Sequence, residues 1–228
     1  GDDSLVGAAG ADSISGGDGN DTITATGTGL LTIDAGTGDD KVTNANIAGA
    51  SIDLGTGNDT LSSAGADDTI SGGDGNDTIV DTGGVNIVTG GAGDDKVTSD
   101  TGADNIDLGA GNNTLTDAGG SNIIAAAGGN DTIGAGSGND SITAGDGTNT
   151  VNSGTGTDTV TSGAGNDAIT LGGGGLITSG DGNDTLIGGG GGLTIDAGNG
   201  DDNVTTGAGA GSMEPGAAAN TLLDSGGN

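Results

Sequence analysis

The chain has 228 residues, of which 57 are glycine, and it contains no Phe, Tyr, Trp, His or Cys. Its 33 acidic residues and two lysines give a formal net charge of −31. A conventional hydrophobic core is excluded because the large side chains that fill protein interiors are missing. Binding to nucleic acid or to anionic lipid is excluded by the charge. What remains is a solvated coil or a repeat fold that bound cations stabilise.

A nine-residue repeat predicts one short strand per repeat along the whole chain. We expect 25 strands, each centred on one inward-facing apolar residue, and 21 of the 24 spacings between these residues are nine. One such strand buries very little, so the units must stack on one another. In chain order the central residues are Leu5, Ile14, Ile23, Ile33, Val42, Ile52, Leu61, Ile70, Ile79, Val88, Val97, Ile106, Leu115, Ile124, Ile133, Ile142, Val151, Val160, Ile169, Ile177, Leu186, Ile195, Val204, Met213 and Leu222.

The segment 16–24, GGDGNDTIT, shows the repeated unit most clearly. Glycines allow a tight turn with positive φ, and the Thr-Ile-Thr ending is typical of a short strand. Two residues before the central residue stands Asp in 15 units and Asn in five. We call this position the ligand position, because a carboxylate there would lie next to the exposed carbonyl groups of the glycine turn.

Odd-numbered and even-numbered units differ at the ligand position, which indicates two units per coil and a true repeat of about 18 residues. We call the turns before the odd strands the odd edge and those before the even strands the even edge. On the odd edge all 13 ligand positions are Asp or Asn, whereas five of 12 on the even edge are neither. Those five are Leu31, Ala50, Gly175, Leu193 and Gly211.

Oxygen ligands of this kind favour calcium, which takes about six to eight oxygens in a flexible arrangement. We predict a complete row of calcium sites on the odd edge, a broken row on the even edge, and about 10–17 ions in total, because there are about 17 gaps between adjacent ligating turns. The predicted ligands on the odd edge are Asp3, Asp21, Asp40, Asp59, Asp77, Asp95, Asn113, Asp131, Asn149, Asp167, Asp184 and Asp202. Those on the even edge are Asp12, Asp68, Asp104, Asp140 and Asp158.

Segments 16–24, 72–80, 136–143, 163–170 and 180–187 resemble the RTX (repeats-in-toxin, hemolysin-type) calcium-binding nonapeptide, G-G-x-G-x-D-x-U-x. The resemblance implies an all-β, right-handed parallel β-roll of about 12 coils with calcium between successive turns. At about 4.8 Å per stacked strand this is a rod on the order of 60 Å long. We expect the roll to span 1–205 and a degenerate last coil or cap to span 206–228, where the only Met, Glu and Pro of the chain occur.

Leu31 and Leu193 replace the ligand in two similar segments, and we expect both leucines to point inward and fill the space of a calcium ion. Lys41 and Lys96 are expected on an exposed strand face. Catalysis is not expected, because His, Cys and Tyr are absent and no nucleophile motif occurs. No apolar run long enough to insert into a membrane is present.

Three functions fit these expectations. The first is a calcium-stiffened structural rod outside the cell, at the bacterial surface, as part of an S-layer, an adhesin stalk or a filament. The second is the RTX portion of an enzyme or toxin secreted by a type I system. The third is ice binding, which the scarcity of threonine at outward turn positions disfavours. The chain begins with Gly1 rather than Met, which suggests a fragment or a processed product, and uniform repeats with open ends favour self-association or lattice assembly.

Overall fold

The computed structural model describes residues 1–208, 211–216 and 218–224. In this part of the chain all regular structure is β, with 25 strands and no helix. Each of the 25 predicted central residues lies in one of these strands, so the predicted all-β architecture with two strands per coil, about 12 coils in all, is confirmed. The chain divides into two compact units, Gly1–Leu115 and Thr116–Asn228.

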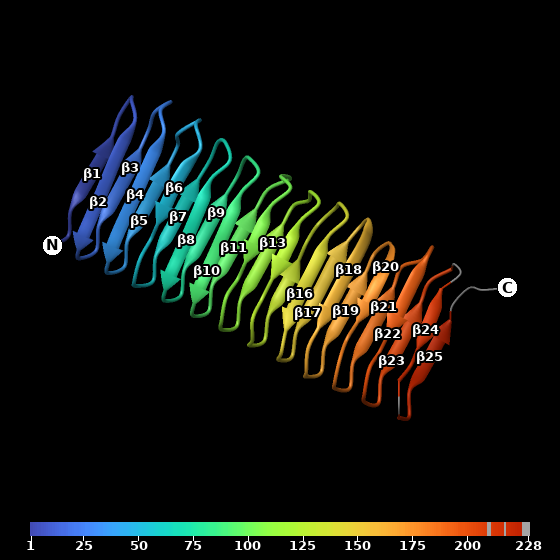
Figure 1. The fold of residues 1–228 in the computed structure, drawn as a ribbon. Helices are drawn as coiled ribbons and strands as arrows, with labels where there is room; N and C mark the ends of the chain where they lie inside the picture. The colour runs from blue at the N-terminus through green and yellow to red at the C-terminus, as the bar shows by residue number, and fades with distance from the viewer. Residues whose placement is uncertain (209–210, 217, 225–228) are drawn as a thin grey trace. The chain divides into compact units, whose positions relative to one another are not determined.

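In the first unit, consecutive strands alternate between two parallel sheets, so that each strand pairs with the strand one coil away (Figure 1). The odd sheet consists, in spatial order, of β1 (Ser4–Gly7), β3 (Thr22–Ala25), β5 (Lys41–Asn44), β7 (Thr60–Ser63), β9 (Thr78–Asp81) and β11 (Lys96–Ser99). The even sheet consists of β2 (Asp12–Asp18), β4 (Leu31–Thr37), β6 (Ala50–Asp53), β8 (Thr69–Asp74), β10 (Ile87–Ala92) and β12 (Asn105–Asp107).

The second unit repeats this arrangement, and β13 (Thr114–Asp117) contains the boundary between the two units. Its odd sheet consists of β15 (Thr132–Gly134), β17 (Thr150–Gly154), β19 (Ala168–Leu171), β21 (Thr185–Gly188), β23 (Asn203–Thr206) and β25 (Thr221–Asp224). Its even sheet consists of β14 (Ile123–Ala125), β16 (Ser141–Gly145), β18 (Thr157–Ser162), β20 (Gly174–Thr178), β22 (Leu193–Asp196) and β24 (Ser212–Glu214).

The register between coils stacks equivalent residues directly on one another. In the odd sheet of the first unit, Leu5 pairs with Ile23, Ile23 with Val42, Val42 with Leu61, and Leu61 with Ile79. Strict side-chain alternation along a strand then places every second residue inside the coil. The sequence period of about 18 residues is therefore the period of the solenoid.

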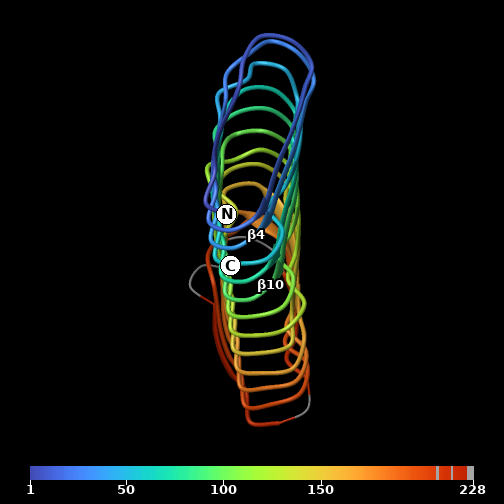
Figure 2. The same ribbon diagram turned by 90° about the vertical axis from the view of Figure 1, so that its left-hand side faces the viewer.

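The interior of each coil is a narrow space between the two sheets, and Figure 2 shows the coils as flattened loops whose long sides are the strands. Three inward residues in and just before β3 illustrate its contents: Asp21 at the ligand position, the central Ile23, and Ala25 at the end of the strand, all at most 2% exposed. Aliphatic side chains from both sheets fill the middle, while acidic and small polar side chains lie toward the two edges. The core is therefore thin and partly polar.

Glycine is required in the turns because the coils approach one another closely there. Gly17 and Gly36 occupy equivalent turn positions in successive coils, with φ of 99° and 112°. A Cβ placed on Gly36 would lie only 2.1 Å from the Gly17 carbonyl oxygen. A larger residue would separate the coils and break the backbone hydrogen bonds that join them.

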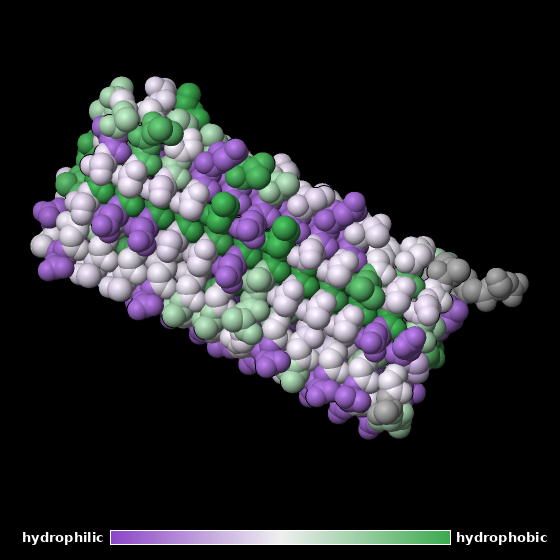
Figure 3. Space-filling view, in the orientation of Figure 1, coloured by the Kyte–Doolittle hydropathy of each residue, from purple (hydrophilic) through white to green (hydrophobic). Residues whose placement is uncertain are grey.

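The outer face is largely polar. On the face drawn in Figure 3, hydrophilic and intermediate residues surround a narrow line of apolar residues. Lys41 and Lys96 are exposed on the odd sheet, as predicted. Within the described residues, no helix is long and apolar enough to cross a membrane.

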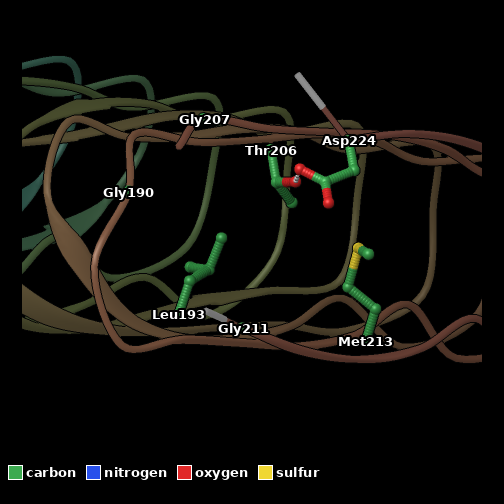
Figure 4. Close-up of a pocket in the computed structure, with 7 residues that line it drawn as sticks. All are labelled: Gly190, Leu193, Thr206, Gly207, Gly211, Met213 and Asp224. Atoms are coloured by element: carbon green, nitrogen blue, oxygen red, sulfur yellow. Dashed lines mark hydrogen bonds between the residues drawn. The ribbon is translucent and has the colours of Figure 1, made fainter. Parts of the chain in front are cut away.

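The segment predicted as a cap, 206–228, contributes the end of β23 and the strands β24 and β25, which pair in the register of the preceding coils. Residues 209–210, 217 and 225–228 of this segment lie outside the described part. Leu193 and Met213 line a small cavity here, together with Gly190, Thr206, Gly207, Gly211 and Asp224 (Figure 4). Packing is looser at this cavity because glycines surround the two apolar side chains.

Candidate metal centre

The Asp side chains at the ligand position of the odd edge form a continuous hydrogen-bonded ladder inside the first unit. The Oδ1 atom of each side chain accepts a hydrogen bond from the backbone N–H at the ligand position of the preceding coil, with N···O distances of 2.7–2.8 Å. The series runs from the N–H group of Asp3 through Asp21, Asp40, Asp59, Asp77 and Asp95 to Asn113. One oxygen of each carboxylate is thus used to join two coils.

The second unit has the same ladder at distances of 2.7–2.9 Å. It runs from the N–H group of Asp131 through Asn149, Asp167, Asp184 and Asp202 to Asn220. All predicted ligands of the odd edge therefore lie in one of two ladders, and within each ladder every residue is adjacent to its equivalent in the next coil.

The second carboxylate oxygen, Oδ2, is buried and has no hydrogen-bond partner in eight of these residues. They are Asp21, Asp40, Asp59, Asp77, Asp95, Asp167, Asp184 and Asp202, and their side chains are 1–2% exposed. A buried carboxylate oxygen without a donor or a counterion is strongly unfavourable. The odd edge thus presents a row of acceptor atoms that require a proton or a cation.

Burial raises the pKa of these carboxyl groups. The pKa of Asp59 rises to about 6, chiefly through burial and further through the charges of Asp77, Asp40 and Asp39, while the N–H of Asp40 opposes the shift. The pKa of Asp95 also rises to about 6, again chiefly through burial. For Asp40 and Asp77 the shift has the same direction and the same main cause. A cation bound beside these groups would restore their ionised form.

Backbone carbonyl oxygens converge with Oδ2 where glycine stands five residues before the ligand position. A Cβ placed on Gly16 would lie 2.3 Å from both Asp21 Oδ2 and the Ala35 carbonyl oxygen. A Cβ on Gly72 would lie 2.6 Å from Asp77 Oδ2 and 2.4 Å from the Gly90 carbonyl oxygen. Since calcium–oxygen bonds are about 2.3–2.6 Å long, these residues fit a calcium ion held by a carboxylate and a carbonyl of successive coils.

Other turns of the odd edge have a side chain at this place. The position of Gly16, Gly72 and Gly90 is occupied in neighbouring coils by Leu54 and Leu108, both fully buried. In further coils it is Ala35, Ala126, Ala144 or Ala197, and before Asp167 and Asp184 it is a buried serine, Ser162 or Ser179. The space next to Oδ2 therefore differs from turn to turn, which the residue at the ligand position alone does not indicate.

The asparagines at the ligand position use their amide group differently from the aspartates. Asn149 Nδ2 donates to the carbonyl oxygen of Gly145 at 3.2 Å, and Asn113 Nδ2 donates to those of Gly109 and Gly111 at 3.5 and 3.4 Å. An N–H group there interacts with turn carbonyls that a cation could otherwise bind. Their prediction as calcium ligands remains a prediction.

A second ladder lies on the exposed side of the odd edge and runs in the opposite direction. The residue just before the ligand position accepts, through Oδ1, the backbone N–H of its equivalent in the following coil. Asn20 N–H donates to Asp2, Asp39 N–H to Asn20, and Asn58 N–H to Asp39, at 2.8–3.0 Å. The Asn-Asp dipeptide of the repeat thus joins each coil to both of its neighbours.

On the even edge, serine hydroxyl groups satisfy most of the carboxylates. Ser63 Oγ donates to Asp68 Oδ2 at 2.5 Å and Ser153 Oγ to Asp158 Oδ2 at 2.5 Å, and Ser99 Oγ donates to Asp104 Oδ2. Asp140 has Ala135 at the serine position, and its Oδ2 atom has no partner. Asp12 is only half-buried. Among the predicted even-edge ligands, Asp140 is therefore the one whose surroundings resemble the odd edge.

Of the five even-edge positions without a ligand, three hold buried apolar side chains, as expected for the two leucines, and the other two are glycine. Leu31 and Leu193 are each 4% exposed. A Cβ placed on Gly188 would lie 2.0 Å from Leu193 Cδ2, so the leucine occupies the space beside that glycine. Sequence reasoning identified these leucines but missed the serines, because their donor role becomes visible only once the turn brings them to the carboxylate.

Within the described residues, no three Asp, Glu, His or Cys side chains converge on one point as a metal cluster. The buried carboxylates of the odd edge are distributed one to a turn, so a cation bound beside them would take most of its ligands from backbone oxygens. Such an oxygen-only set suits calcium and does not suit metals that prefer nitrogen or sulfur.

A family model described as RTX calcium-binding nonapeptide repeat (4 copies) matches residues 1–27, 51–79, 80–115, 109–142, 116–151, 143–175 and 178–213. These segments cover most of the chain and include the glycine turns of Asp21, Asp77 and Asp95. The turn of Asp40 lies outside them although its hydrogen bonds are the same. Among curated proteins, none matches the chain.

Proposed function

The chain belongs to the RTX calcium-binding nonapeptide repeat family, and from that premise we propose that it acts as a calcium-folded structural segment outside the cell, at the bacterial surface. In this proposal it forms part of an S-layer, an adhesin stalk or a surface filament, and it has no catalytic role. The repeats occupy the described chain and leave no other kind of domain in it.

The observation that carries the proposal is the row of buried, unpartnered Oδ2 atoms on the odd edge. Without a cation these carboxylates repel one another along the stack, since their equivalents in successive coils are about 4.8 Å apart. Calcium, when bound, supplies positive charge to two coils at once. The chain's own residues hold the coils in register through the two ladders of Asp and Asn side chains.

A second candidate is the RTX portion of an enzyme or toxin that a type I system secretes. The same buried carboxylates support it, because a segment that cannot fold at low calcium concentration would stay unfolded until it reaches calcium outside the cell. The two candidates share the calcium dependence and differ in what neighbouring domains do. A catalytic or pore-forming domain in the same gene product would favour the second.

Calcium titration followed by circular dichroism tests the shared part. We expect the β signal to increase cooperatively with calcium and to be lost on addition of EGTA. Magnesium at equal concentration is the matched control, since it dehydrates reluctantly and demands octahedral geometry. A β signal that is equally strong after exhaustive chelation would contradict the proposal.

A further inference from the structure

The even edge of the first unit contains one coil in which donor and acceptor are exchanged. In the coils before and after it, a serine five residues ahead of the ligand position donates to an aspartate, as Ser63 does to Asp68. In the coil between them the aspartate is Asp81, at the serine position, and the ligand position is Asn86. Strand pairing places Asp81 directly beside Ser63 of the neighbouring coil.

This exchange leaves the Asp81 carboxylate without a matching donor. Its side chain is 1% exposed, and Oδ1 accepts the Gly83 N–H at 3.3 Å, but Oδ2 is buried and has no partner. Asn86 does not supply one, because its Oδ1 accepts the Asp68 N–H at 2.8 Å and its Nδ2 donates to the Gly83 carbonyl at 3.4 Å. Asp81 Oδ2 is therefore an acceptor inside the coil that receives no hydrogen bond.

The surroundings of Asp81 are acidic. Its pKa is raised to about 7, first by burial and then by the charge of Asp68, with smaller contributions from Asp100 and Asp104. Asp100 has its own buried Oδ2 atom without a partner, while its Oδ1 accepts the Gly102 N–H at 2.6 Å. The only lysines of the chain are exposed on the odd sheet and cannot compensate these charges.

We propose that Asp81, with Asp100 of the next coil, binds a divalent cation at the even edge, between the turns that precede β10 and β12. Asp81 lies five residues before the ligand position, where the nonapeptide has glycine, so this site differs in kind from those of the odd edge. The remaining ligands are backbone oxygens of the stacked turns. The choice of calcium as the cation rests on the proposed function.

The test counts bound calcium in the full chain at pH 7 by isothermal titration calorimetry, at saturating calcium. We expect Asp81→Asn to bind one ion fewer than the wild type. Asp53→Asn, which removes one exposed charge from β6 of the same unit, is the matched control and should bind the wild-type number. The double change Asp81→Ser with Asn86→Asp installs the serine–aspartate pair of the adjacent coils and should also bind one ion fewer.

Asp77→Asn on the odd edge separates this inference from the proposed function. If Asp77→Asn loses one ion while Asp81→Asn and the double variant keep the wild-type number, the Asp81 site is refuted and the odd-edge calcium stands. If the wild type binds no calcium, both are refuted. An unchanged ion count in Asp81→Asn identifies a proton rather than a cation at Asp81, and this also overturns the inference.

Discussion

At the residue scale, the two oxygens of each odd-edge aspartate have different roles. Oδ1 of Asp77 accepts the Asp59 N–H and joins two coils, whereas Oδ2 faces a carbonyl of the next coil across the space beside Gly72. The first interaction needs no metal, and asparagine makes it equally well. The interaction of Oδ2 distinguishes aspartate from asparagine. It depends on a small residue five positions before the ligand position.

Gly72→Ala is predicted to remove one calcium site without preventing folding. The added Cβ would lie 2.6 Å from Asp77 Oδ2 and 2.4 Å from the Gly90 carbonyl oxygen, where the ion would bind. Alanine at the equivalent place in another coil, Ala35, shows that the fold accepts it. Calorimetry should show one ion fewer, and Ala35→Gly, the reverse change, should show an equal or larger number. An unchanged ion count in Gly72→Ala contradicts the assignment.

Ser63→Ala is predicted to destabilise the protein at saturating calcium. Asp68 Oδ2 would lose its 2.5 Å hydrogen bond from Ser63 and keep only the longer one from Asn44, at 3.5 Å. Removing one partner of a buried pair costs about 1–3 kcal/mol. Urea unfolding measures the loss, with the exposed Ser62→Ala as control. Equal stability of the two variants would mean that the serine has no such role.

At the element scale, the strands were the most predictable part of the structure. The residues two before and two after a central aliphatic, such as Asp21 and Ala25 around Ile23, face the same interior, and this alternation is visible in the sequence. The extension of β2 and β4 through their glycines was not predicted, because it depends on pairing between turns. The hydrogen-bond partners of individual Asp Oδ2 atoms could not be predicted either. Serine, alanine and leucine all fit the same backbone five residues before the ligand position.

The row of buried carboxyl groups on the odd edge predicts a pH dependence of stability. Asp59 and Asp95 have pKa values of about 6 in the folded chain and an ordinary value of 3.8. The folded chain therefore binds more protons than the unfolded chain between these values. Without calcium, the free energy of unfolding is greatest below pH 3.8 and decreases as the pH rises through about 6. The apparent affinity for calcium should instead rise with pH, because calcium displaces protons.

The β signal in circular dichroism at pH 4, 5, 6 and 7, in calcium-free buffer and along a calcium titration, measures both trends. The double change Asp59→Asn with Asp95→Asn is the control, and it should reduce the calcium-free slope. A calcium-free stability that increases from pH 4 to pH 7 would show that the buried carboxyl groups are compensated by something other than protons.

At the scale of the whole molecule, the formal charge of −31 makes calcium relevant to association as well as to folding. Self-association remains a prediction, and the Gly-rich segments 172–175 and 188–192 on the even edge are the surface that we expect to pack with another copy. Light scattering in calcium should show a mass that increases with protein concentration. Asp substitutions at Gly173 and Gly189 would also strain the turns, so the wild-type chain with calcium at low protein concentration is the better reference for the monomer mass. A constant monomer mass at high concentration contradicts the prediction.

The inner and outer ladders of the odd edge restrict how such a chain can change in length, because both must reconnect after a deletion or an insertion. Removing 18 residues, for example 73–90, deletes one full coil and lets both ladders reconnect, because Asp77 and Asp95 are equivalent. Removing nine residues would make every later odd-edge turn an even-edge turn and the reverse. Turns of different kinds would then lie next to each other at the deletion. Insertions and deletions should therefore be tolerated in whole coils, so that gene length among variants of this protein would change in steps of about 54 nucleotides.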